Sequence, residues 1–163
     1  MNRLGIDKRT QVISALVGGT SVNATCRMTG VAKHTVLKLL KNIGCACAAY
    51  HEANVRNLRV RRIQCDEIWA FVYAKQKNVT EEQMAAGAGD CWTWTAIDAD
   101  TKLIVSCTLG DRGAATAHDF IEDLASRVIN RIQLTTDGYR LYADAVEDAF
   151  GCEIDYAMLV KIY

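Results

Sequence analysis

The stretch that decides the fold is Ile63-Gln64-Cys65-Asp66-Glu67-Ile68-Trp69-Ala70-Phe71-Val72. It is rich in β-branched and aromatic residues, which are typical of strands, and we predict a strand over 63–73. Strand interiors disfavour aspartate, and a buried carboxylate is costly unless a cation or hydrogen-bond donors meet it. Asp66 is therefore the first candidate functional residue.

A second aspartate ends another strand-like run, Ile132-Gln133-Leu134-Thr135-Thr136-Asp137-Gly138. On its own, Asp137-Gly138 is also a common turn pair. If this run lies parallel to the first strand, the two carboxylates can face one another. Hard oxygen ligands without His or Cys favour Mg²⁺ or Mn²⁺ over zinc, and a pair of such ions supports substitution at a phosphodiester. We predict that Asp66 and Asp137 are catalytic and metal-binding residues.

A site for two ions normally needs a third carboxylate, and the sequence offers no convincing one. Glu67 follows Asp66 directly and is expected on the opposite side of the strand. The other acids look like turn formers, helix-surface residues or strand starts; they are Asp98, Asp100, Asp119, Glu122, Asp123, Glu147, Asp148, Glu153 and Asp155.

The segments around these two runs predict the architecture. We expect strands at 63–73, 91–97, 102–109, 132–136 and 153–158, and helices at 114–128 and 139–150. Residues 75–90 form a polar excursion, and Asp98-Ala99-Asp100-Thr101 is typical of a hairpin turn. Three hairpin-linked strands followed by alternating helices and strands predict an α/β fold with a mixed five-stranded sheet and flanking helices.

The amino-terminal residues predict three helices. Gly18-Gly19 ends the first, Thr20 or Ser21 can cap the second, and Gly30 permits the positive φ of a tight turn. The third helix is expected over 32–43, with Gly44 closing it. This arrangement is typical of a helix-turn-helix module within residues 1–44. An ordinary three-helix bundle is the alternative.

The charge is divided unevenly along the chain. Residues 1–62 hold 11 Lys or Arg against 2 Asp or Glu, whereas residues 63–163 hold 8 against 17. A basic front half indicates a polyanion partner such as double-stranded DNA, although the halves could simply attract each other. The third helix would enter the major groove, and residues 45–62 would be a basic connector or a solvated linker helix. The predicted DNA-binding residues are Lys33, His34, Lys38, Lys41, Arg56 and Arg59.

Other sequence features indicate the cellular compartment and the state of the cysteines. No apolar run is long enough to cross a membrane and no signal peptide precedes the polar start, so we expect a cytoplasmic protein. Seven cysteines without an export signal indicate reduced thiols. Cys45-Ala46-Cys47 with His51 hints at a metal site, but no second ligand pair completes a zinc site.

The motifs together resemble a known family, the bacterial insertion-sequence transposases, and within it the insertion-sequence-one group. The resemblance spans nearly the whole chain. It rests on Cys26-Arg27-Met28-Thr29-Gly30-Val31-Ala32, Thr35-Val36-Leu37-Lys38-Leu39-Leu40, Cys65-Asp66-Glu67-Ile68-Trp69, Trp92-Thr93-Trp94-Thr95-Ala96-Ile97-Asp98 and Thr135-Thr136-Asp137-Gly138-Tyr139.

The resemblance implies a ribonuclease-H-like catalytic domain over 63–163 with an Asp-Asp-Glu (DDE) triad. Asp66 matches the first acid and Asp137 the second. The third, a glutamate on a helix after the fifth strand, has no counterpart before the last residue, Tyr163, so we expect a carboxyl-terminally truncated domain.

The implied activity is Mg²⁺-dependent cleavage and strand transfer at transposon ends. The implied partners are the terminal inverted repeats, target DNA and further copies of the chain, in the bacterial cytoplasm at the nucleoid. A non-catalytic DNA-binding regulator, an inactive remnant of a transposon gene and a host nuclease of the same fold are the alternatives.

Overall fold

The chain forms two compact units, which meet in sequence at Asn54 and Val55. The structure is a computed structural model that describes residues 4–160. Each unit has its own buried apolar cluster. The expected end of the catalytic domain at Tyr163 lies outside the described residues.

Three helices build the first unit: α1 (Ile6–Val17), α2 (Val22–Thr29) and α3 (Lys33–Asn54). The Ser21 hydroxyl accepts a hydrogen bond from the Ala24 N–H at 3.2 Å, which caps α2 as predicted. Gly30 ends α2 with φ of 69°, in the left-handed region that the turn needs. The core of this unit consists of Val12, Val31 and Val36.

Helix α3 continues well past its predicted end. It runs through Gly44 to Asn54, so the prediction that Gly44 closes it is wrong. A glycine inside a helix costs only about 1 kcal/mol relative to alanine, and Ala46, Ala48 and Ala49 favour continuation. The first ten residues of the predicted connector are therefore helical.

The rest of that predicted connector belongs to the second unit and is bonded to the segment that follows α5. The Leu58 N–H donates to the Arg127 carbonyl at 2.8 Å, and the Ile129 N–H donates to the Leu58 carbonyl at 3.1 Å. The Asn130 amide donates to the Val60 carbonyl at 2.8 Å. These hydrogen bonds fix the residues that lead into the sheet.

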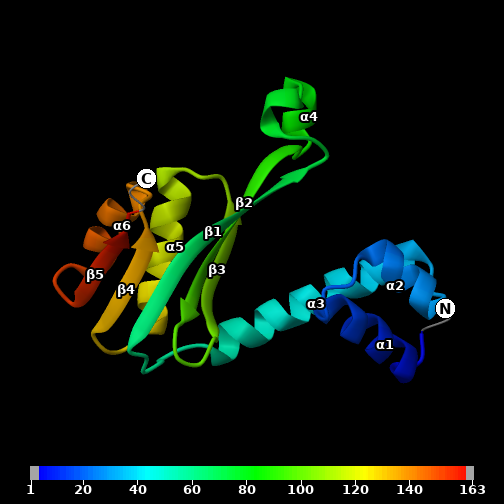
Figure 1. Cartoon of the computed structure of the whole chain (residues 1–163), viewed down its shortest axis with the longest axis horizontal. Coiled ribbons are helices and arrows are strands. Elements are labelled where there is room, and N and C mark those ends of the chain that lie inside the picture. The colour runs from blue at the N-terminus through cyan, green and yellow to red at the C-terminus, as the bar shows by residue number, and fades with distance from the viewer. Residues whose placement is uncertain (1–3, 161–163) are drawn as a thin grey trace. The chain divides into compact units, whose positions relative to one another are not determined.

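A five-stranded mixed sheet forms the centre of the second unit, as predicted (Figure 1). Its strand order is β3-β2-β1-β4-β5. The strands are β1 (Arg62–Val72), β2 (Gly89–Asp98), β3 (Ile104–Gly110), β4 (Ile132–Asp137) and β5 (Ile154–Leu159). Strand β1 is central, antiparallel to β2 and parallel to β4, and β5 is parallel to β4.

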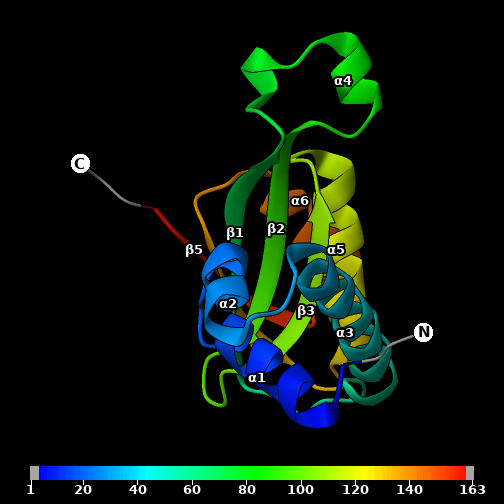
Figure 2. The same ribbon diagram turned by 90° about the vertical axis from the view of Figure 1, so that its right-hand side faces the viewer.

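Strands β1 and β2 extend beyond the rest of the sheet as a hairpin arm. Their pairing continues to Val72 and Gly89, and the tip carries the short helices η1 (Gln76–Asn78) and α4 (Glu81–Ala85) (Figure 2). Large apolar side chains of the arm, Ile68 and Phe71 among them, are exposed. Only the first half of the deciding stretch therefore contributes to the core.

Helices α5 (Ala114–Arg127) and α6 (Leu141–Phe150) contribute to the same apolar cluster as the inward-facing residues of the sheet. Trp94 is fully buried, with its ring centroid 5.8 Å from that of Phe120 and 5.5 Å from that of Tyr142. Ile63 and Cys65 of β1 point into this core, and burial raises the pKa of the Cys65 thiol. Gln64, between them, is exposed on the other face of the sheet.

Candidate functional site

The structure brings Asp66 and Asp137 together. In the ladder between β1 and β4, Gln64 lies opposite Thr135, which puts Asp66 and Asp137 level with each other two residues further on. Each alternates with inward-facing neighbours and lies on the face of the sheet opposite the buried core. One carboxylate oxygen from each lies within 4.8 Å of the other.

Neither aspartate is buried, contrary to the reason for which it was singled out. Asp66 is exposed, and the Asp137 side chain is 43% exposed. The energetic cost of a buried carboxylate therefore does not apply to these two residues.

That cost applies to their neighbour Glu67, whose side chain is only 1% exposed. As predicted from strand geometry, Glu67 falls on the core side of β1, in step with Ile63 and Cys65. One of its carboxylate oxygens nevertheless lies within 4.8 Å of those of Asp66 and Asp137. The pairing of β1 with β4 ends at Gln64 and Thr135, so at Glu67 and Asp137 no hydrogen bonds between these two strands separate the two faces of the sheet.

Arg112, which belongs to no motif of the sequence, lies against this acidic group. Its guanidinium donates to Oε2 of Glu67 from Nε at 3.2 Å and from one terminal nitrogen at 2.9 Å. The same terminal nitrogen is 3.7 Å from Oδ2 of Asp137. The guanidinium also lies 4.7 Å from the ring centroid of Trp92 and 4.1 Å from that of Tyr139, within range of cation–π attraction.

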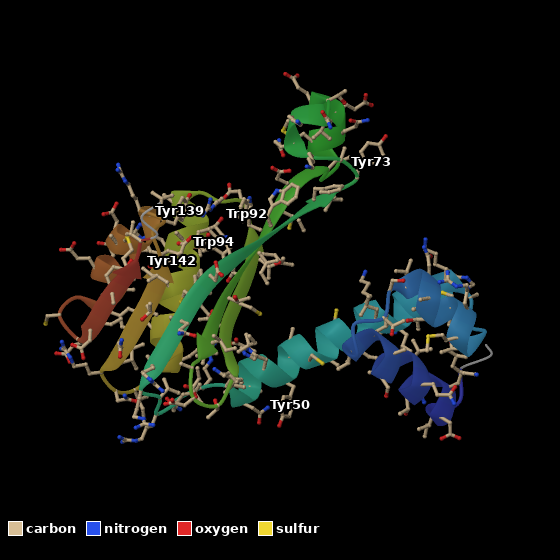
Figure 3. All side chains as sticks on the ribbon, in the orientation of Figure 1. Tyr50, Tyr73, Trp92, Trp94, Tyr139 and Tyr142 are labelled. Atoms are coloured by element: carbon tan, nitrogen blue, oxygen red, sulfur yellow. The ribbon has the colours of Figure 1, made fainter. Side chains whose placement is uncertain are left out.

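The loop that carries Arg112 is anchored to the core. The indole N–H of Trp94 donates to the Asp111 carbonyl at 3.0 Å, and the hydroxyl of Tyr139 donates to the Arg112 carbonyl. The Tyr139 N–H in turn donates to Oδ1 of Asp137 at 3.0 Å. Figure 3 shows Trp92, Trp94, Tyr139 and Tyr142 gathered at this end of the sheet.

A groove of about 750 Å³ lies over the two aspartates. Polar residues of β1, β2 and β4 line it together with apolar residues near the end of β5. Its lining includes Gln64, Asp66, Thr95, Ile97, Arg112, Thr135, Asp137, Tyr139, Leu159 and Val160. A groove with acidic groups at its base can hold a cation together with a bound anionic chain.

The remaining acids considered as third ligands are not part of this group. Asp98 accepts hydrogen bonds from the Asp100 N–H and the Thr101 hydroxyl, which makes it a turn former as expected. The hydrogen bond from Thr101 outweighs partial burial and lowers the pKa of Asp98. Asp155 is paired with Arg131. Within residues 4–160, Asp66, Glu67 and Asp137 form the single group of three or more His, Cys, Asp or Glu close enough to share an ion.

The predicted DNA-binding residues of the first unit lie on α3. Lys33, His34, Lys38 and Lys41 are all exposed. Nε2 of His34 shares a hydrogen bond of 3.2 Å with the Thr35 hydroxyl. The three lysines present positive charge along the first three turns of the helix.

The other two predicted DNA-binding residues belong to the second unit. Arg56 is half-buried and donates to the Ser126 hydroxyl at 2.7 Å. Arg59 is exposed. Part of the Arg56 guanidinium thus holds the segment that leads into β1 against α5.

Two further features concern the cysteines and the helices. All seven cysteines lie within the described residues and are free thiols, Cys45 and Cys47 on α3 among them. Between residues 4 and 160, no helix has the length and apolar character needed to cross a membrane.

Comparison of the chain with models of known protein families, and with curated proteins, finds no match.

Proposed function

We propose that this chain is a transposase of the DDE type, with a ribonuclease-H-like catalytic domain, that cleaves and joins DNA at transposon ends with Mg²⁺ or Mn²⁺. The observation that carries the proposal is the pair Asp66 and Asp137. They lie side by side at a groove, on neighbouring parallel strands of a sheet with the order β3-β2-β1-β4-β5. The resemblance of the sequence motifs to those of insertion-sequence transposases supports the same function.

The donor set fits the proposed ions. Carboxylate oxygens are the ligands that Mg²⁺ and Mn²⁺ prefer, and no His or Cys side chain belongs to this described group. Bound ions would activate an attacking hydroxyl and stabilise the departing oxygen of a phosphodiester. Asp66 and Asp137 would hold them, and the open groove would admit the DNA backbone.

The proposed role of the first unit is to bind duplex DNA through α2 and α3 as a helix-turn-helix. Exposed lysines on α3 suit phosphates, and His34 near its start suits a base edge. We propose that the terminal inverted repeats are the specific target, that copies of the chain assemble on two ends, and that the protein acts at the bacterial nucleoid.

Substitution of either aspartate tests the catalytic proposal. The full chain is incubated with supercoiled plasmid and Mn²⁺ or Mg²⁺, and nicking is followed by gel electrophoresis. We expect Asp66→Asn and Asp137→Asn each to abolish nicking while duplex binding stays unchanged, because each removes a metal ligand and no phosphate contact. Asp119→Asn, at an exposed position of α5, is the matched control.

The outcomes separate the candidate functions. Metal-dependent nicking that survives both substitutions would refute the assigned site. Duplex binding without nicking by the unaltered chain would favour the DNA-binding regulator, for which the exposed lysines of α3 are the supporting observation.

A further inference from the structure

We propose that Glu67 supplies a third carboxylate to the divalent-cation site, and that Arg112 is a built-in cation that occupies it until the metal ion binds. The inference rests on the proposed function, because it adds a ligand to the Asp66 and Asp137 site. It assigns a role to the most buried acid of that group.

The first argument is an unmet hydrogen-bonding need at Glu67. Its side chain is 1% exposed, and only Oε2 is bonded to Arg112. The other oxygen, Oε1, is buried and no donor meets hydrogen-bond geometry with it, although the Tyr142 hydroxyl lies close enough to act on the Glu67 carboxylate. A buried carboxylate oxygen without a partner is strongly unfavourable, so a ligand that fills this need gains binding energy.

The second argument is that the acidic group already attracts a cation. Arg112 contacts Glu67 at 2.9 Å and approaches Asp137 at 3.7 Å, so one guanidinium balances two of the three carboxylates. Its planar group lies over the rings of Trp92 and Tyr139, and it donates no hydrogen bond to Oε1 of Glu67. A compact divalent ion can contact oxygens that the planar guanidinium group cannot reach.

The third argument is distance. One oxygen from each of the three acids lies within 4.8 Å of the others. With metal–oxygen distances of about 2.1 Å, opposite oxygens of an octahedral Mg²⁺ ion are about 4.2 Å apart and neighbouring ones about 3.0 Å apart. The carboxylates must therefore draw closer when the ion binds, and Asp66 and Asp137, which are exposed and half-exposed, have room to rotate.

Tyr142 is the neighbour that could supply a purely structural explanation. Its hydroxyl is buried and meets hydrogen-bond geometry with no partner, and burial, followed by hydrogen bonding toward the Glu67 carboxylate, raises the pKa of this phenol. If Glu67 served only to pack against Tyr142, removal of that hydroxyl would affect the site as strongly as removal of the Glu67 charge. Tyr142→Phe is therefore an informative control.

The experiment measures Mn²⁺ binding to the full chain directly, from the loss of the electron paramagnetic resonance signal of free Mn²⁺. We expect Glu67→Gln to weaken binding by about tenfold or more, because it removes one charged ligand. Tyr142→Phe and Glu82→Gln, the latter at an exposed position of α4, are expected to bind as the unaltered chain does. Circular dichroism confirms that each variant is folded.

Arg112→Gln provides a second, independent readout that does not require Glu67 to be altered. Without the competing guanidinium, we expect Mn²⁺ to bind several-fold more tightly. In the double variant Arg112→Gln/Glu67→Gln this gain is lost. If Glu67 acted only by positioning Arg112, Glu67→Gln would have no further effect once Arg112 is gone.

Failure of the inference differs from failure of the proposed function. Mn²⁺ binding that disappears in Asp66→Asn but is unchanged in Glu67→Gln would overturn the role of Glu67 and leave the aspartate site intact. No saturable Mn²⁺ binding by the unaltered chain would overturn both. Arg112→Gln that binds no more tightly than the unaltered chain would overturn the role of Arg112.

Discussion

Asp123 on α5 shows how one half-buried carboxylate is kept charged in this fold. Arg127 donates to both of its oxygens, at 2.7 and 2.8 Å, and the Ser106 hydroxyl of β3 donates to Oδ2. Burial raises the pKa of Asp123, but the hydrogen bonds from Arg127 and Ser106 outweigh it, so the pKa lies below its usual value. The carboxylate therefore links α5 to the sheet in its ionised form.

We expect Asp123→Asn to destabilise the protein by about 1–2 kcal/mol at pH 7, since a partly exposed charged hydrogen-bond network is removed. A lowered pKa in the folded state adds stability above the unfolded value of about 3.9 and loses it as the pH falls through the folded value. The difference between the two proteins should therefore shrink below about pH 4. Urea unfolding at pH 7, 5 and 3 measures it, and an equal difference at all three would contradict this account.

Single residues also show the limits of sequence reasoning at the site. Asp66 and Asp137 were selected because a buried acid needs a partner, yet both are at least partly exposed. Strand alternation placed Glu67 correctly on the core side, but alternation cannot reveal that β1 and β4 stop pairing just before it. Arg112 could not be found, because its contacts depend on how the β3–α5 loop folds back.

At the scale of elements, α3 carries the proposed contacts with DNA. We expect the affinity of the unaltered chain for duplex DNA to fall steeply as the salt concentration rises. In Lys38→Ala, the slope of the logarithm of the binding constant against the logarithm of the salt concentration should be smaller by about 0.9, the value for one phosphate contact. Fluorescence anisotropy of a labelled duplex at several salt concentrations provides the measurement. Lys77→Ala, at an exposed position of η1, should leave the slope unchanged.

A slope that is the same for Lys38→Ala and the unaltered chain would remove Lys38 from the interface. Salt-insensitive binding by the unaltered chain would count against the groove-binding role of α3 as a whole, because the release of counterions from DNA always depends on salt.

The elements themselves were largely predictable because their hydrophobic periods are clear. The strands at 63–73 and 132–136 and the helix at 114–128 were each placed within one residue of their observed bounds. The end of α3 was missed because a small local penalty at Gly44 was given too much weight against a following run of good helix formers. The exposure of the second half of β1 in the hairpin arm was not predicted, since its apolar residues look like core residues in the sequence.

At the scale of the molecule, the two units have separate cores of very different size. We expect Val36→Ala to destabilise the first unit by about 2 kcal/mol through lost burial and a cavity among Val12, Val31 and Val36. The three tryptophans all lie in the second unit, so near-ultraviolet circular dichroism reports on that unit, whereas far-ultraviolet circular dichroism follows the helices of both.

The expected result is that the far-ultraviolet transition of Val36→Ala begins at lower urea, while the near-ultraviolet transition keeps its midpoint. Leu134→Ala, in the core of the second unit, should instead move the near-ultraviolet midpoint. If Val36→Ala moved both midpoints equally, the two cores would unfold as one cooperative system.

The stacking of the Arg112 guanidinium over Trp92 has an optical consequence. Trp94 is fixed in the interior and Trp69 lies on the hairpin arm, so a shift of the arginine alters the surroundings of one indole among three. The fluorescence emission of Trp92 would then change in wavelength or intensity as Arg112 leaves the carboxylates. If an ion displaces the arginine as proposed, the chain contains its own fluorescent probe for ion binding, and no dye needs to be attached.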